Sequence, residues 1–198
     1  MAHAPGDTAT LSGPAAAVLA LLMATPLWCN AGEPDRTPGF LVVGVLAHDR
    51  GPSSDKHERG VDPTVELQFR PPARKLWQTI GAPRPHAGLT PNFNGDTSIV
   101  YGGATYAFDV RRNLFAELGF GLALHNGPLR AEDPIACKED SDCGFGSRVL
   151  LRYAVELGVR LRRERALMLF FDHVSHKELF ASENEGIDHI GLRYRLRY

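Results

Sequence analysis

The segment from Phe170 to Tyr194 reads FFDHVSHKELFASENEGIDHIGLRY and contains three residue types that together can cleave an ester. His173 precedes Ser175 by two positions, and Asp188 follows Ser175 by thirteen. In such a set the serine attacks a carbonyl carbon, the histidine takes the serine proton, and the aspartate fixes the imidazole tautomer. This chemistry requires a backbone that brings the three side chains to one face.

The chain around this segment alternates between apolar and polar residues with a period of two. From Ser147 to Arg162 the odd positions are all apolar after the first, while the even positions carry arginines, a glutamate and small residues. Leu114–Leu124 and His189–Tyr198 repeat the pattern. Neighbouring residues of a strand point to opposite faces, whereas a helical period would scatter the arginines through the apolar face. The pattern predicts strands with one apolar and one charged face.

Eight segments qualify as strands, and several are as long as a transmembrane strand of about 9–11 residues. They are Phe40–His48, Thr64–Phe69, Arg84–Phe93, Ser98–Val110, Leu114–Leu124, Ser147–Arg162, Ala166–Ser175 and Asp188–Tyr198. The connections at 111–113 and 162–166 are short, whereas those at 126–146 and 176–187 are long, which is typical of outer-membrane barrels. The sequence therefore predicts an all-β fold, an eight-stranded antiparallel outer-membrane β-barrel located in the bacterial outer membrane.

In such a barrel the apolar faces contact lipid and the charged faces fill a narrow lumen without a pore. The arginines expected in the lumen, with Glu117, Glu156 and Asp172 as partners, are Arg148, Arg152, Arg160, Arg193, Arg195 and Arg197. The alternative is a soluble lipid-binding barrel, in which the apolar set would line a ligand cavity and the arginines would face water.

The N-terminal segment indicates export. Residues 14–28, PAAAVLALLMATPLW, form an apolar run too short to span a membrane, and small residues follow at Cys29 and Ala31. This predicts a signal peptide over 1–31 and one barrel domain over 32–198. The formal net charge of −1 argues against nucleic acid as a partner, which usually requires a basic face.

The remaining cysteines lie close together in a hydrophilic stretch. Cys137 and Cys143 bracket KEDSD, and a disulfide between them suits an exported protein. The alternative is two free thiols. A pair of cysteines alone is a weak signal for a metal.

The alternation also indicates where the three chemical residues point. His173 and Ser175 continue the apolar set that contains Leu169, and Asp188 continues the set that contains Ile190. All three should therefore face outward, at the strand ends next to the long connection 176–187. Because sequential strands pair, the side chains should meet, which also lowers the cost of placing polar groups beside hydrocarbon.

A metal centre is the competing interpretation of the same segment. Three histidines lie in it, His173, His176 and His189, with Asp172 and Glu178 nearby, and imidazole and carboxylate are plausible zinc ligands. The alternation separates His176 and His189 from the outward set, so no common centre is expected. The prediction is a site without metal.

The motifs HVS, NEGID and GLRY resemble those of the bacterial lipid A 3-O-deacylases, grouped with the acyloxyacyl hydrolases. The resemblance covers most of Phe115 to Tyr198. It implies Ser175 as nucleophile, His173 as base and Asp188 as the acid, and it implies ester hydrolysis without a cofactor. The family usually has Asn directly after the nucleophile, where this chain has His176, so His176 becomes the candidate oxyanion donor.

The expected function is an outer-membrane serine esterase that removes the ester-linked acyl chain at the 3-position of lipid A. Its partners would be lipid A or lipopolysaccharide and membrane lipid, with a homodimer left open. Two alternatives remain from other classes: a non-catalytic outer-membrane barrel of the same family and the soluble lipid-binding barrel.

Overall fold

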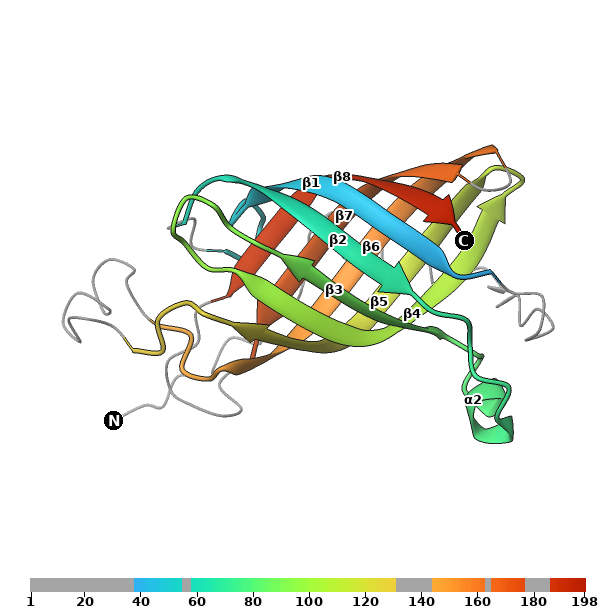
Figure 1. The fold of residues 1–198 in the computed structure, drawn as a ribbon, viewed down its shortest axis with the longest axis horizontal. Helices are drawn as coiled ribbons and strands as arrows, with labels where there is room; N and C mark the ends of the chain where they lie inside the picture. The colour runs from blue at the N-terminus through green and yellow to red at the C-terminus, as the bar shows by residue number, and fades with distance from the viewer. Residues whose placement is uncertain (1–37, 55–57, 131–143, 163–164, 177–185) are drawn as a thin grey trace, which may run out of the picture.

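The computed structural model describes residues 38–54, 58–130, 144–162, 165–176 and 186–198. The described strands pair in sequence order, each antiparallel to the next, and β8 returns to pair with β1, which closes the barrel. Figure 1 shows β1 and β8 side by side where the sheet closes. The elements are β1 (Phe40–His48), β2 (Val61–Gln68), α2 (Lys75–Thr79), β3 (Arg84–Thr90), β4 (Ile99–Arg111), β5 (Leu114–His125), β6 (Val149–Arg162), β7 (Arg165–Ser175) and β8 (Ile187–Arg197).

The predicted architecture is confirmed, and the predicted strand limits differ most in the first half. The prediction starts the second strand at Thr64, whereas β2 starts at Val61. Asp62 and Pro63 hide this start, because both residue types are depleted in strands. β3 ends at Thr90 rather than at Phe93.

The apolar face of the strands lies outside. On β7, Leu167 and Leu169 are exposed, while Ala166, Met168 and Phe170 between them are buried. An apolar outer surface of this kind excludes the soluble alternative, which required the apolar set to line the interior. No helix among the described residues is long and apolar enough to cross a bilayer.

The interior is filled by side chains, among them paired charges and buried apolar residues such as Phe115 and Met168. Arg152, Arg193 and Arg195 are all buried. Their partners are Asp172 for Arg152, Glu66 and Glu156 for Arg193, and Glu117 for Arg195. Gly44 leaves room for this packing, since a Cβ there would lie 2.6 Å from Cγ of Arg193. Buried ions that are paired in this way avoid the large cost of an isolated buried charge.

The prediction for the other arginines is partly wrong. Arg148 and Arg197 are exposed, and Arg160 is only half-buried in a pair with Asp109. Arg148 precedes β6 and Arg197 is the last residue of β8. Alternation assigns both side chains to the lumen, but at the ends of the strands water reaches them.

The described parts of four connections, 49–54 with 58–60, 91–98, 126–130 with 144–148, and residues 176 and 186, lie at the end of the barrel away from the C-terminus (Figure 1). This is the outer end, because the longer loops of outer-membrane barrels are extracellular. At the opposite end the connection 69–83 carries α2, while 112–113 and 163–164 are short. The first 37 residues and 131–143, with the predicted signal peptide, Cys137 and Cys143, lie outside the described residues.

Candidate active site

The hairpin of β7 and β8 brings the three predicted residues together at the outer end. His173 and Asp188 are directly paired across the two strands, and Ser175 is two residues from His173 on the same face. Paired residues place their Cβ atoms about 4.5–5.5 Å apart, so their side chains can bond directly. His173 Nδ1 lies 2.6 Å from Asp188 Oδ1, and His173 Nε2 lies 2.8 Å from Ser175 Oγ.

This arrangement defines the protonation pattern of the imidazole. The carboxylate of Asp188 can only accept a hydrogen bond, so Nδ1 of His173 donates to it. In the neutral ring Nε2 is then the acceptor, and the Ser175 hydroxyl donates to it. The chain of contacts therefore has the direction that a serine nucleophile and a histidine base require.

A loop that the sequence analysis did not single out holds Asp188. The backbone N–H of Ser53 donates to Asp188 Oδ2 over 2.7 Å, and the N–H of Arg50 donates to the Asp188 carbonyl over 3.0 Å. A Cβ on Gly51 would overlap the Asp188 carboxylate, so only glycine allows this close approach. The loop after β1 thus fixes the second carboxylate oxygen and shields the group from water.

All three residues belong to the outward set of their strands, but they are covered to different degrees. Asp188 is fully buried and Ser175 is 2% exposed, whereas the side chain of His173 is 21% exposed. Gly186 packs on the ring, since a Cβ there would lie 2.8 Å from His173 Cε1. Local backbone, rather than the barrel interior, therefore covers Asp188 and His173.

The outer surface next to these residues is apolar. Ser175 is paired with Leu151 of β6, and His173 is paired with Tyr153. One rung further from the outer end, Phe171 is paired with Ile190 of β8. The three side chains therefore lie at the upper edge of the lipid-facing surface.

The other predicted candidates are distributed as follows. His176 is fully buried directly after β7, and His189 is buried on the inner face of β8. His173 and His189 therefore lie on opposite faces of the hairpin, and Glu178 lies outside the described residues. The competing interpretation, a metal centre shared by His173 and His189, does not fit this arrangement of the described residues.

A second set of groups with metal-binding chemistry lies on the inner face. His48, Asp62 and His189 are buried and bring one ligand atom each within 4.8 Å of the others. His189 was considered as a metal ligand from the sequence, but not together with His48 and Asp62, because these lie in strands that are distant from it along the chain. The predicted barrel carries a signal for this contact, because closure pairs the first strand with the last. In the structure β1 pairs with β8, and His48 is directly opposite His189.

The fold and its apolar outer face define an outer-membrane β-barrel, and its outer surface carries a linked serine, histidine and aspartate. The family model for lipid A 3-O-deacylase (PagL) matches residues 63–197, so the chain belongs to this family. This family is one of ester hydrolases that act on lipid A, which indicates a role in remodelling the outer membrane.

Solved structures similar to the chain include two outer-membrane proteins. The crystal structure of the outer membrane enzyme PagL has a TM-score of 0.55 at 15% identity, over 79% of this chain and 98% of that one. The crystal structure of Neisserial surface protein A (NspA) has a TM-score of 0.52 at 16% identity, over 82% of this chain and 100% of that one. At these identities the likeness concerns the fold alone. No curated protein sequence matches the chain.

Proposed function

We propose that the protein is a serine esterase that removes the ester-linked acyl chain from the 3-position of lipid A. The observation that supports it most is the continuous chain of contacts from Asp188 through His173 to Ser175. Membership of the lipid A 3-O-deacylase family supports the substrate.

In the first step Ser175 Oγ attacks the ester carbonyl carbon while His173 Nε2 takes the hydroxyl proton. The tetrahedral intermediate then collapses, the C–O bond to the 3-position breaks, and His173 returns the proton to the leaving alkoxide. Water, deprotonated by His173, then attacks the carbonyl carbon of the acyl-serine, the bond to Ser175 Oγ breaks, and His173 returns the proton to Oγ as the fatty acid leaves. Asp188 stabilises the imidazolium in both steps and does not itself become protonated.

The position of the residues favours a lipid of the outer leaflet as substrate. The ester of such a lipid lies at the boundary between headgroup and acyl chains, and the three residues lie at the corresponding edge of the apolar surface. Phe171 and Ile190 lie below His173 on the outer face, where the acyl chain would pack. Hydrolysis by these residues needs no metal or cofactor, since the nucleophile is activated by a neighbouring base.

His176 is proposed as one donor to the oxyanion, in the place where the family has Asn. A neutral imidazole donates one hydrogen bond, and loss of one oxyanion donor typically costs on the order of 10²–10³ in rate. If His176 does not donate, the second candidate function applies, a non-catalytic outer-membrane barrel of the same family. The full burial of His176 is the observation that favours this alternative.

Mass spectrometry of lipid A tests the proposal. Cells that express the wild type should lose a 3-linked acyl chain, while cells that express Ser175→Ala should keep it. Ser147→Ala is the matched control, because this serine lies at the same end of the barrel and, among the described residues, its hydroxyl bonds to the carbonyl and the N–H of Val149. Lipid A that is intact with the wild type, or deacylated equally with Ser175→Ala, would contradict the proposed activity.

The variant His176→Asn separates the two candidate functions. It restores the residue that the family has at this position, and an esterase whose oxyanion donor is weak should become faster. A barrel that is inactive as wild type and also inactive as His176→Asn supports the non-catalytic alternative.

A further inference from the structure

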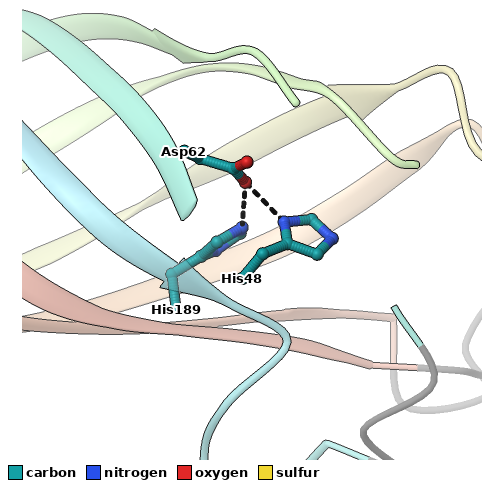
Figure 2. Close-up of side chains that lie close together, drawn as sticks. All are labelled: His48, Asp62 and His189. Atoms are coloured by element: carbon teal, nitrogen blue, oxygen red, sulfur yellow. Dashed lines mark hydrogen bonds and ion pairs between the residues drawn. The ribbon is translucent and has the colours of Figure 1, made fainter. Parts of the chain in front are cut away.

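Three side chains meet inside the outer end of the barrel, on the face opposite the candidate active site. They come from the end of β1, the start of β2 and the start of β8, and Figure 2 shows them around a common point. The atoms that face each other are His48 Nδ1, Asp62 Oδ2 and His189 Nε2, all within 4.8 Å of one another. The three residues are at most 1% exposed.

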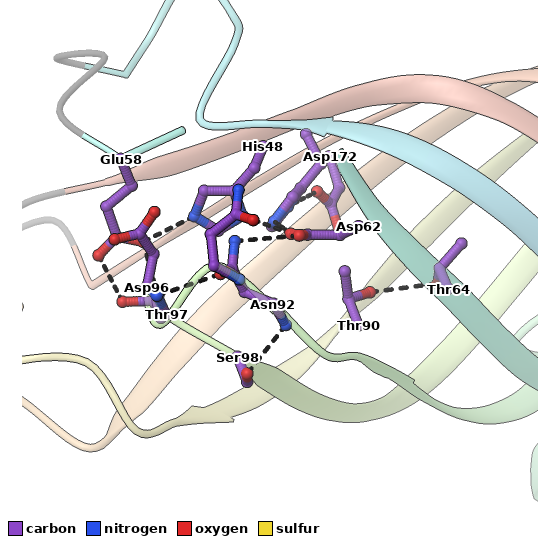
Figure 3. A network of polar contacts seen from close by, with 12 residues as sticks. His48, Glu58, Asp62, Thr64, Thr90, Asn92, Asp96, Thr97, Ser98 and Asp172 are labelled. Atoms are coloured by element: carbon purple, nitrogen blue, oxygen red, sulfur yellow. Dashed lines mark hydrogen bonds and ion pairs between the residues drawn. The ribbon is translucent and has the colours of Figure 1, made fainter. Parts of the chain in front are cut away.

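Each of these side chains is held from behind by another polar group. His48 Nε2 lies 2.6 Å from Glu58 Oε2, and His189 Nδ1 lies 2.8 Å from Asp172 Oδ1. Asn92 Nδ2 donates to Asp62 Oδ1 over 3.0 Å, and Figure 3 shows this network. Histidines that bind metal almost always donate their second ring N–H to a carboxylate, carbonyl or water, which orients the ring. Both histidines here have a carboxylate in that position.

His189 supplies the strongest single observation. Its Nδ1 donates to Asp172, so in the neutral ring Nε2 carries a lone pair directed toward the cluster. This atom is buried, lies 3.9 Å from Asp62 Oδ2, and has no hydrogen-bond partner among the described residues. A buried polar atom without a partner costs free energy, and an ion would satisfy it.

The separations fit a small tetrahedral ion after modest movement. Metal–ligand bonds of about 2.0–2.2 Å to zinc place tetrahedral ligand atoms about 3.3–3.6 Å apart. His48 Nδ1 is 2.5 Å from Asp62 Oδ2, and His189 Nε2 is 3.9 Å from the same oxygen. The first distance must widen and the second must shorten, each by less than about 1 Å by this geometry.

The charge around the cluster also favours a cation. Glu58, Asp62 and Asp172 contribute three carboxylates. Among the described residues, Arg152 is the arginine that pairs with one of them, through the other oxygen of Asp172. A proton between His48 and Asp62 occupies the place of the ion in the metal-free protein. That proton leaves to solvent when the ion binds, since the ligand nitrogen must be deprotonated.

We propose that His48, Asp62 and His189 form a binding site for one divalent transition-metal ion, with Zn²⁺ as the preferred candidate. Two imidazoles and one carboxylate suit zinc and its neighbours, whereas Ca²⁺ and Mg²⁺ prefer six or more oxygen ligands. The ion links β1 to β8 where the barrel closes, and through Asp62 it also links β2 to both strands. The proposal is independent of ester hydrolysis, because the site lies on the inner face.

The test uses the full-length chain without a histidine tag, refolded in detergent and stripped of metal with a chelator. Titration with Zn²⁺ should give one ion per barrel and a higher unfolding temperature, since a ligand that binds only the folded state stabilises it. Titration with Co²⁺ should give the visible absorption of a tetrahedral site, and excess Ca²⁺ or Mg²⁺ should not displace either ion.

Three variants locate the site. His189→Gln should lose tight binding, and Glu58→Gln should bind about 10–100-fold more weakly, because it removes only the group behind His48. His86→Gln is the matched control, since His86 is a buried interior histidine that bonds to Thr105 instead of to the cluster. It should bind the ion as the wild type does.

Absence of stoichiometric Zn²⁺ binding by the wild type would overturn the proposal. Equal affinity of His189→Gln and the wild type, or an equal loss in His86→Gln, would overturn it as well. If His189→Gln fails to refold, as judged by heat-modifiable migration in gels, Glu58→Gln decides, and its unchanged affinity contradicts the site. None of these measurements depends on activity, so failure here leaves the proposed esterase untouched.

Discussion

Replacing Asp188 by Asn should inactivate the enzyme through the histidine tautomer, not through loss of structure. The Ser53 N–H donates to Asp188 Oδ2, so the carbonyl oxygen of an Asn side chain should turn toward Ser53. The amide NH₂ then faces His173 Nδ1, which must become an acceptor. The ring proton moves to Nε2, and His173 can no longer accept the proton of Ser175.

The size of the effect follows from this reversal. The same substitution in a serine protease triad lowers kcat about 10⁴-fold, which corresponds to about 5.4 kcal/mol of transition-state stabilisation. Asp188 has both oxygens bonded and is fully buried, so water cannot easily replace its role. We expect a comparable loss in the initial rate of acyl release from lipid A in mixed micelles.

The control for Asp188→Asn is Asp109→Asn, which removes a carboxylate that pairs with Arg160 on the exposed surface at the opposite end. It should retain the wild-type rate. Heat-modifiable migration should show that both variants form the barrel. A rate for Asp188→Asn within tenfold of the wild type would refute the tautomer argument.

Further predictions concern the packing, the interior charges and the outer loops. Gly186→Ala should lower kcat at least tenfold with little change in folding, because its Cβ would displace the His173 ring; steady-state kinetics and circular dichroism check this. Arg152→Met should lower the free energy of unfolding by about 3–5 kcal/mol in a denaturant titration, since the buried Asp172 carboxylate loses its arginine partner. Arg160→Met should lower it by under about 1 kcal/mol, because that pair is partly exposed. Burial opposes ionisation of Glu58, but hydrogen bonds from His48 and Thr97 outweigh it and hold the pKa of Glu58 below its ordinary value of 4.5. The contact of Glu58 with the Thr97 N–H should therefore be fully present above pH 4.5 and be lost as the pH falls through the lower folded value, and hydrogen exchange at Thr97 should show no such dependence in Glu58→Gln.

The strands of the second half were predictable because their alternation is long and regular. The limits of β5 and of β7 each differ from the prediction by one residue. In β2 the strand signal is interrupted by Asp62 and Pro63, so the prediction starts at Thr64, and the first three residues are recognised as strand only through their pairing with β1. Alternation also gives no information about where water reaches a strand end, which is why Arg197 was assigned to the lumen.

The candidate active site was predictable for a local reason. His173, Ser175 and Asp188 lie on two consecutive strands of one hairpin, so alternation and sequential pairing suffice to bring them together. The support from Arg50 and Ser53 was not predictable, because barrel closure brings these residues to Asp188 from 135 positions away in the case of Ser53. The inner cluster was missed for the same reason, since His48 reaches His189 only through the pairing of β1 with β8.

The central claim is that Ser175 acts as a nucleophile on the outer surface of the barrel, and a covalent probe tests it directly. The refolded protein is treated with a long-chain alkyl fluorophosphonate, which reacts with activated serines, and the modified peptide is identified by mass spectrometry. We expect one adduct on Ser175, formed much more slowly in Asp188→Asn and absent in Ser175→Ala. An adduct on another serine, or none on Ser175 in the folded wild type, would contradict the central claim.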